Sequence, residues 1–120
     1  MKARTMQFAL RAIRLCRNIP ASQEGRVIGR QLLRSATSVG ANYRAACRAR
    51  SKADFVSKLA IVLEEADETL FWLELLVQAN IMPEEKLKLL IQEANELVSI
   101  FVTSLRTAKN HAPAATQSAI

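Results

Sequence analysis

Apolar residues recur at helical spacing in separate stretches of the chain. In the first stretch they lie three or four positions apart from about Thr5 to Asn18, and Pro20 then disfavours helical geometry in the residue before it. A second stretch begins near Ser22 or Gln23 and keeps the same period to about Ala49. No segment alternates apolar and polar residues long enough to predict a strand, so the pattern predicts an all-α fold.

Two further helices have clear start and stop signals. Ser51, followed three positions later by Asp54, matches a capping box and predicts the start of the third helix. Asn80 suits the left-handed conformation that ends a helix, and Pro83 followed by two glutamates favours the start of a fourth. Short connections between four helices favour antiparallel neighbours, which predicts an up-down-up-down four-helix bundle.

The length of 120 residues fits one domain. We expect the four-helix bundle domain to cover residues 1–111. Residues 112–120 are small, polar and without period, which predicts a disordered C-terminal tail that carries no function. No apolar run approaches the roughly 18 residues that cross a bilayer, and the N-terminal segment lacks a signal-peptide pattern. The expected location is therefore cytoplasmic.

Charge is distributed unevenly along the chain. The net charge is +6, yet residues 1–50 hold eleven Lys or Arg against one acid, whereas residues 51–82 hold two Lys against six acids. At about 100° per residue, five arginines of the second helix fall within one narrow sector. These are Arg26, Arg30, Arg34, Arg44 and Arg48. The first helix repeats the pattern with Arg4, Arg11 and Arg14 on one side.

Two interpretations of these arginines are open. Arginine suits bidentate contact with phosphate, so the basic residues form a candidate nucleic-acid interface for RNA or DNA. A solvated face whose charges pair with acids of a neighbouring helix or subunit explains the same pattern. Aromatic residues do not interleave with the basic ones, which argues against stacking on single strands.

The apolar surface exceeds what one bundle core needs. The apolar arc of the first helix covers more than half of its circumference. A second apolar group lies on the other side of the third helix and consists of Ile61, Trp72, Leu75, Leu76 and Ala79. We expect another copy of the chain to cover these faces, and therefore a homo-oligomer.

The sequence gives little support for a catalytic site or a metal site. A di-iron bundle needs inward carboxylates on all four helices and Glu-x-x-His pairs. The sole histidine, His111, lies at the tail, so no nucleophile with a nearby base can be assembled. Cys16 and Cys47 fit small buried hydrophobes. The acids of the third helix are interpreted as a solvated face or as partners of basic residues: Glu64, Glu65, Asp67 and Glu68. We expect no enzyme, no metal and no cofactor.

The run from Ser35 to Asn42 places mediocre and poor helix formers inside a helical period. Small side chains pointing to nearly all sides let neighbouring helices approach closely, so packing outweighs local propensity here. Asn42 is a buried polar group that needs partners, or it faces a bound partner. The residues expected to serve helix packing are Ser35, Ala36, Ser38, Gly40, Ala41 and Asn42.

Two segments, QLLRSATSVGANYRAA and SKADFVSKLAIVLEEADETLFWLELL, resemble the 23S rRNA intervening sequence proteins. The resemblance spans roughly residues 5 to 107. It rests on the run from Ser35 to Asn42, on Lys52, Asp54 and Phe55, and on Trp72 and Leu73. Where many members continue with Ile-Ala-Glu-Gly, this chain reads Tyr43, Arg44, Ala45 and Ala46, which removes an acid and lengthens the row of arginines.

The resemblance implies a four-helix protomer that assembles into a homopentameric ring. It also implies kinship with accessory proteins of diversity-generating retroelements, which bind nucleic acid and a reverse transcriptase. It implies no enzyme and transfers no catalytic residues. Non-specific nucleic-acid binding is thus one expected function, and a structural or protein-interaction module without a nucleic-acid role is the alternative.

Overall fold

The computed structural model describes residues 1–110, and within that range the chain forms four helices and no strand. The helices are α1 (Lys2–Cys16), α2 (Gln23–Cys47), α3 (Lys52–Gln78) and α4 (Glu84–Asn110). The prediction of an all-α, four-helix fold is confirmed. His111 and the tail predicted at 112–120 lie outside the described residues.

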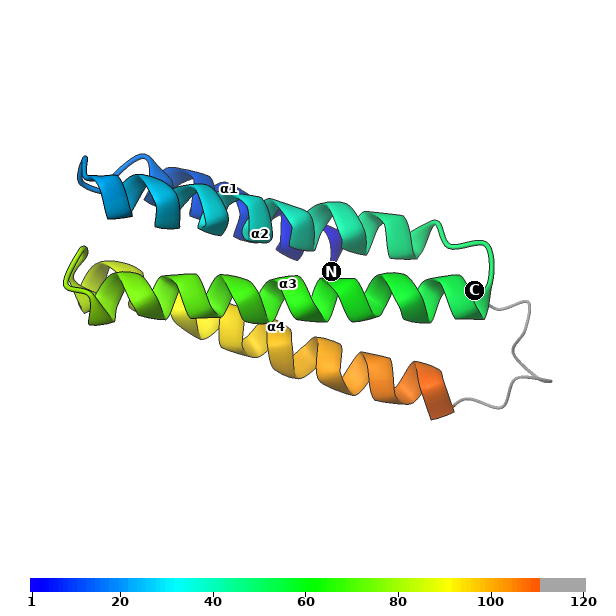
Figure 1. The fold of residues 1–120 in the computed structure, drawn as a ribbon. Helices are drawn as coiled ribbons and strands as arrows, with labels where there is room; N and C mark the ends of the chain where they lie inside the picture. The colour runs from blue at the N-terminus through cyan, green and yellow to red at the C-terminus, as the bar shows by residue number, and fades with distance from the viewer. Residues whose placement is uncertain (111–120) are drawn as a thin grey trace.

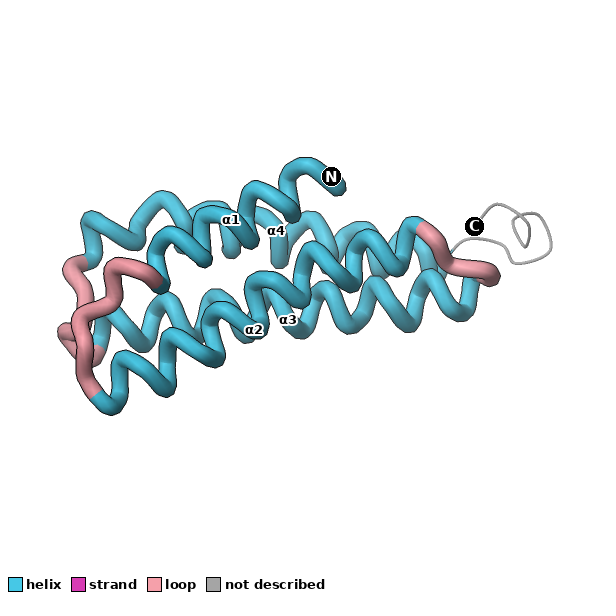
Figure 2. Tube along the Cα trace, turned by 90° about the horizontal axis from the view of Figure 1, so that it is seen from above, coloured by secondary structure: helices cyan, strands magenta, loops and turns pink. Residues whose placement is uncertain are grey.

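The four helices lie side by side along one long axis (Figure 1). The α1–α2 and α3–α4 connections lie at one end of the molecule and the α2–α3 connection at the other (Figure 2). α2 packs against both α1 and α3, and α3 packs against α4, whereas α1 makes few contacts with α4. α1 begins part-way along the bundle, so only α2, α3 and α4 continue past its N-terminus (Figure 1).

Serine side chains cap the starts of α2 and α3. The Oγ of Ser22 accepts a hydrogen bond from the Gly25 backbone N–H at 3.0 Å. The Oγ of Ser51 accepts one from the Asp54 backbone N–H, also at 3.0 Å. Each bond satisfies one of the N–H groups that the first turn of a helix leaves without a partner. The predicted start of α3 is confirmed. The Asp54 carboxylate itself forms an ion pair with Nζ of Lys58 at 3.0 Å.

The C-terminal end of α3 is a Schellman motif at Asn80. Asn80 has a φ of 58°, and it is the one residue other than glycine with positive φ in residues 1–110. Its backbone N–H donates to the Val77 carbonyl at 3.0 Å, and the N–H of Ile81 donates to the Leu76 carbonyl at 3.0 Å. Asparagine tolerates this conformation better than other side chains, so the left-handed residue predicted at this position is confirmed.

The ends of α1 and α2 differ from the predicted ones by two or three residues. α1 begins at Lys2 rather than Thr5, because the Thr5 side chain donates back to the Lys2 carbonyl at 3.1 Å inside the helix instead of capping it. α1 ends at Cys16, before the predicted Asn18. α2 ends at Cys47 rather than Ala49. No local cap chemistry marks these ends in the sequence, so periodicity alone located them loosely.

One hydrophobic core runs through the bundle and draws on all four helices. Its largest fully buried apolar side chains are Phe8, Leu32, Leu59, Leu73, Leu76, Leu87, Leu97 and Phe101. The ring of Tyr43 on α2 packs against that of Phe101 on α4, with 5.9 Å between centroids. None of the four helices is both long and apolar enough to span a membrane.

Two glycines of α2 differ in how much room their surroundings leave for a side chain. A Cβ at Gly25 would lie 2.8 Å from the Pro20 carbonyl oxygen, because the α1–α2 connection folds back over the first turn of α2. A Cβ at Gly40 would lie 3.4 Å from the Thr5 carbonyl oxygen, which is an ordinary contact. Gly40 therefore faces α1 at ordinary contact distance, but Gly25 is the position at which the backbone leaves no room for a side chain.

We predict opposite responses to alanine at these two positions. Gly25→Ala should lower the free energy of unfolding by about 1–3 kcal/mol, the usual cost of overpacking. Gly40→Ala should leave it unchanged or raise it by up to about 1 kcal/mol, because alanine is the better helix former. Urea unfolding followed by circular dichroism measures both effects. Equal destabilisation by the two substitutions would contradict the assignment of the tight contact to Gly25.

Candidate nucleic-acid interface

Four of the predicted arginines lie along the outer face of α2, counting Arg48, which caps the C-terminus of the helix. Arg26, Arg30, Arg44 and Arg48 are exposed. None of them forms an ion pair with a carboxylate in residues 1–110. The row extends about 33 Å along the helix at 1.5 Å per residue. We call these four residues the arginine row.

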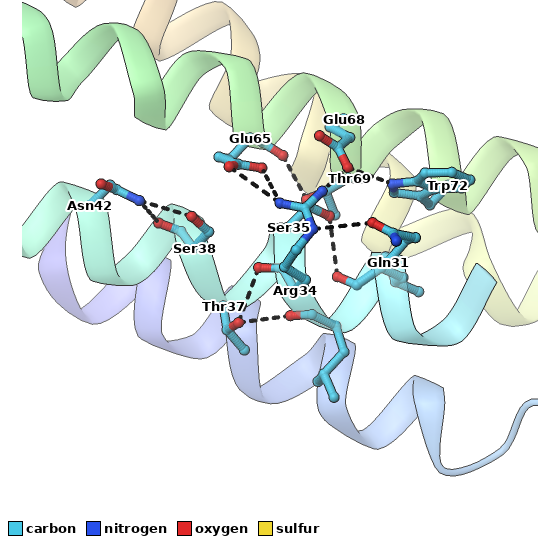
Figure 3. A network of polar contacts seen from close by, with 12 residues as sticks. Gln31, Arg34, Ser35, Thr37, Ser38, Asn42, Glu65, Glu68, Thr69 and Trp72 are labelled. Atoms are coloured by element: carbon cyan, nitrogen blue, oxygen red, sulfur yellow. Dashed lines mark hydrogen bonds and ion pairs between the residues drawn. The ribbon is translucent and has the colours of Figure 1, made fainter. Parts of the chain in front are cut away.

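Arg34 lies in the same sector of α2 but is held by side chains of α3 (Figure 3). Its Nη1 lies 3.2 Å from Oε1 of Glu65, and its Nη2 pairs with Glu68. Its Nε donates to Oε1 of Gln31 at 3.1 Å. These carboxylates neutralise the Arg34 charge within the protomer, so it contributes less to an external anion site than the arginine row.

The four acids between positions 64 and 68 of α3 divide into two groups. Glu65 and Glu68 pair with Arg34, and Glu68 also accepts a hydrogen bond from Nε1 of Trp72 at 2.9 Å. Glu64 and Asp67 are exposed and form no ion pair with another described residue. The prediction that these acids serve as a solvated face or as partners of basic residues is confirmed. No group of three or more His, Cys, Asp or Glu in residues 1–110 could hold a metal ion.

Arg4 connects α1 to α4. Its Nε lies 2.7 Å from Oε2 of Glu93, and its Nη2 donates to Oε1 of Glu93 and to Oε1 of Glu96, both at 2.8 Å. The hydrogen bonds from Arg4 hold the pKa of Glu93 below its usual value, and the Arg11 charge acts in the same direction. The two carboxylates raise the pKa of Arg4, so it stays charged. We call this cluster the Arg4 clamp.

The Arg4 clamp changes the role expected for the α1 arginines. Arg4 lies between two helices of its own chain, and half-buried Arg11 lies close enough to influence Glu93. Only Arg14 of this group is exposed. Sequence reasoning missed the clamp because 89 positions separate Arg4 from Glu93, and no local pattern reports which acid a distant helix brings near.

The small-residue run brings α2 and α3 into close contact at Ser35. The hydroxyls of Ser35 and Thr69 are fully buried and lie 2.9 Å apart. Each also lies within hydrogen-bond distance of a carbonyl of its own helix, Leu32 at 3.2 Å and Glu65 at 2.7 Å. Ala36 beside them has no exposed surface. Ser35 and Ala36 therefore lie in the interior, where their small side chains let α2 and α3 approach closely.

The other residues expected to serve helix packing are less buried than Ser35 and Ala36. Asn42 is half-buried, and its Nδ2 donates to the Ser38 carbonyl at 2.9 Å and to Ser38 Oγ at 2.8 Å, so both partners lie on its own helix. Ala41 is exposed, which corrects the packing role predicted for it. The reason is that position 41 falls in the same outward sector as the arginine row.

The apolar group predicted on α3 is only partly on the surface. Leu76 is fully buried in the core, which corrects its assignment to an oligomer interface. Ile61, Trp72 and Leu75 are half-buried, and Ala79 is exposed. α3 packs against both α2 and α4, so its neighbours cover a wide arc of its surface.

Phe71 is the exposed apolar side chain of α3 that sequence reasoning missed. Its side chain is 53% exposed. Its ring meets Trp72 edge to face, with 4.9 Å between centroids. The signal was present in the sequence, since Phe71 lies four positions from Asp67 and three from Glu74 and therefore shares their polar face.

A groove of about 510 Å³ runs between α1 and α2. The wide apolar arc of α1 lines its floor, and Lys2 and Arg44 lie on its border. The remaining lining residues are Thr5, Met6, Ala9, Leu10, Ile13, Thr37, Gly40 and Ala41. Part of the apolar arc of α1 therefore stays uncovered by the described residues and faces this groove.

The two cysteines differ in burial. Cys16 is half-buried with its Sγ 3.5 Å from the Gly29 carbonyl, and burial raises the pKa of its thiol. Cys47 is exposed, so its predicted burial is wrong. Position 47 lies on the side of α2 that faces α1, but α1 begins too far along the bundle to cover it.

The fold and the sequence of the run from Ser35 to Asn42 agree with a match to a known protein family. A sequence model of the 23S rRNA-intervening sequence protein family matches residues 1–103. This chain belongs to that family. The resemblance drawn from the sequence is confirmed at the level of the family, whose function is unknown.

A solved structure shows the same arrangement. It is the crystal structure of a protein with unknown function from the S23 ribosomal protein family of Bacteroides thetaiotaomicron. It is 36% identical to this chain, with a TM-score of 0.81, and the match covers 87% of this chain and 96% of that chain. No functionally curated protein matches this chain.

We predict that the Arg4 clamp makes stability depend on pH through Glu93. Because the pKa of Glu93 is lower in the folded chain, its stabilisation is present above the unfolded value of about 4.3 and is lost as the pH falls through the folded value. A double-mutant cycle of Arg4→Met and Glu93→Gln should give a coupling of about 1 kcal/mol at pH 7. Urea unfolding at pH 3 should show a smaller coupling. A coupling that does not decrease at pH 3 would contradict this role.

Proposed function

We propose that this chain is a non-enzymatic, self-assembling helical-bundle protein that binds RNA or DNA without sequence preference through the arginine row. One observation supports the proposal above all others. Four exposed guanidinium groups follow one helix face, and no carboxylate of residues 1–110 pairs with them. Guanidinium groups suit bidentate contact with phosphate, and the affinity of such a face comes mainly from charge.

Fewer arginines are available to an external anion than the sequence alone suggests. Arg4 and Arg34 have carboxylate partners, and Arg11 lies near Glu93, so these three add little to an external anion site. The arginine row on α2 and exposed Arg14 on α1 carry the proposal. Its length of about 33 Å is close to one turn of B-DNA.

Assembly is the second part of the proposal. We propose an antiparallel up-down-up-down protomer, in line with helix connections that lie at alternating ends, and a homopentameric ring, as the family resemblance implies. A ring would repeat the arginine row in every subunit. Multivalent contact with one nucleic acid would then raise the affinity above that of a single row.

The groove between α1 and α2 favours a second candidate function, that of a protein-interaction module. Its floor is apolar, with Met6, Leu10 and Ile13 from α1. Phosphate gains nothing from an apolar floor, whereas a side chain of another protein does. The two functions are compatible where they use different parts of the α2 surface.

We predict that the arginine row carries the salt dependence of binding. The triple variant Arg26→Gln, Arg30→Gln, Arg48→Gln should bind a labelled duplex of about two helical turns more weakly. The slope of log K against log salt should fall by about 0.9 for each phosphate that the variant no longer neutralises. Fluorescence anisotropy titrations at several salt concentrations measure both quantities. The same titrations with an RNA hairpin show which nucleic acid is preferred.

Arg34→Gln is the matched control, because it removes one positive charge from the same helix sector at a position already neutralised by Glu65 and Glu68. It should change the slope far less than any residue of the arginine row. Light scattering confirms that each variant has the mass of the wild type. Unchanged affinity and slope in a correctly assembled triple variant would overturn the nucleic-acid part of the proposal.

A further inference from the structure

The groove between α1 and α2 combines an apolar floor with positive charge at its border. Met6 on the floor is 56% exposed. Lys2 and Arg44 lie near one another, because α1 and α2 form a hairpin in which Thr5 faces Gly40. No described residue fills the groove. A ligand that fits it must offer an apolar side chain with negative charge beside it.

The outer face of α3 has the complementary properties. Phe71 is 53% exposed, and the acids Glu64, Asp67 and Glu74 around it are exposed. None of the three acids forms an ion pair with another residue of the described chain. We call this surface the Phe71 face. It presents one large apolar side chain between negative charges.

We infer that the Phe71 face of a second copy of the chain docks into the α1–α2 groove. This inference rests on the assembly part of the proposed function and names the two surfaces that meet. Phe71 enters the apolar floor, and acids of α3 approach Lys2 and Arg44. The dimensions agree, since the groove from Lys2 to Ile13 and the face from Glu64 to Glu74 each extend about 15 Å along their helices.

The contact joins two different surfaces, so it is heterologous. A docked pair still offers one free groove and one free Phe71 face, and further copies add head to tail until the rotation closes a ring. The contact also divides the arginine row, because Arg44 becomes part of the interface. Arg26, Arg30 and Arg48 stay available for phosphate, which is why the triple variant above leaves Arg44 unchanged.

Two exposed positions allow each surface to be blocked without disturbing the core. Met6→Glu places an acid on the groove floor, and Phe71→Glu removes the apolar side chain from the opposing face. Both should fold like the wild type by circular dichroism, and both should lose the oligomer mass in light scattering. Leu89→Glu is the matched control, since Leu89 is an exposed apolar residue of α4, 68% exposed, outside both surfaces. It should keep the wild-type mass.

Mixing the two blocked variants gives the decisive measurement. The intact groove of the Phe71→Glu chain should accept the intact Phe71 face of the Met6→Glu chain, and both remaining surfaces are blocked. A heterologous contact therefore predicts a species of two chains in a 1:1 mixture and nothing larger. The double variant Asp67→Lys, Glu74→Lys should also lose assembly. Its new positive charges would repel Lys2 and Arg44, although Phe71 stays in place.

The outcomes separate the inference from the proposal on which it rests. A wild-type chain that is monomeric overturns the assembly part of the proposed function together with this inference, and leaves nucleic-acid binding to the salt titrations. An assembled wild type with blocked variants of unchanged mass overturns this inference alone. Blocked variants that are monomeric and stay monomeric when mixed also overturn it.

Discussion

The close approach of α2 to α3 at Ser35 is the constraint on which the rest of the structure depends. Ser35 and Ala36 are fully buried, and the Ser35 hydroxyl lies 2.9 Å from that of Thr69. Larger side chains would separate the helices, and a buried hydroxyl without a partner would cost about 1–3 kcal/mol. Because α2 is also packed against α1, only one sector of it faces outward, and the arginines occupy that sector.

Charge within the protomer determines which arginines are available to a partner. Arg34 and Arg30 share a helix face, yet α3 presents Glu65 and Glu68 only to Arg34. Arg4 is held by Glu93 and Glu96 at a place where α1 and α4 otherwise make few contacts. The acids thus serve the bundle at two points and form no ion pair with the arginine row among the described residues. This imbalance is the physical basis for an external anionic partner.

The apolar arc of the first helix accounts for the open groove between α1 and α2. α1 has an apolar arc too wide for one neighbour, so packing on α2 leaves Met6 exposed on the floor of an open groove. The opposing charge and apolar content of the Phe71 face make a second copy of the chain a suitable occupant. A self-assembling bundle with a basic outer face unites these observations within a family whose members have no established function.

The sequence by itself determined the all-α class, the four helices and the ends marked by Ser22, Ser51 and Asn80, because capping and periodicity act within a few neighbouring residues. It also placed the arginines of α2 on one face. Only the tertiary structure decided that Arg34 and Arg4 are paired, that Leu76 is buried and Phe71 exposed, and that Gly25 is more crowded than Gly40. Those outcomes depend on which side chains another helix or connection brings to the same level of the bundle. No local pattern in the chain encodes that proximity.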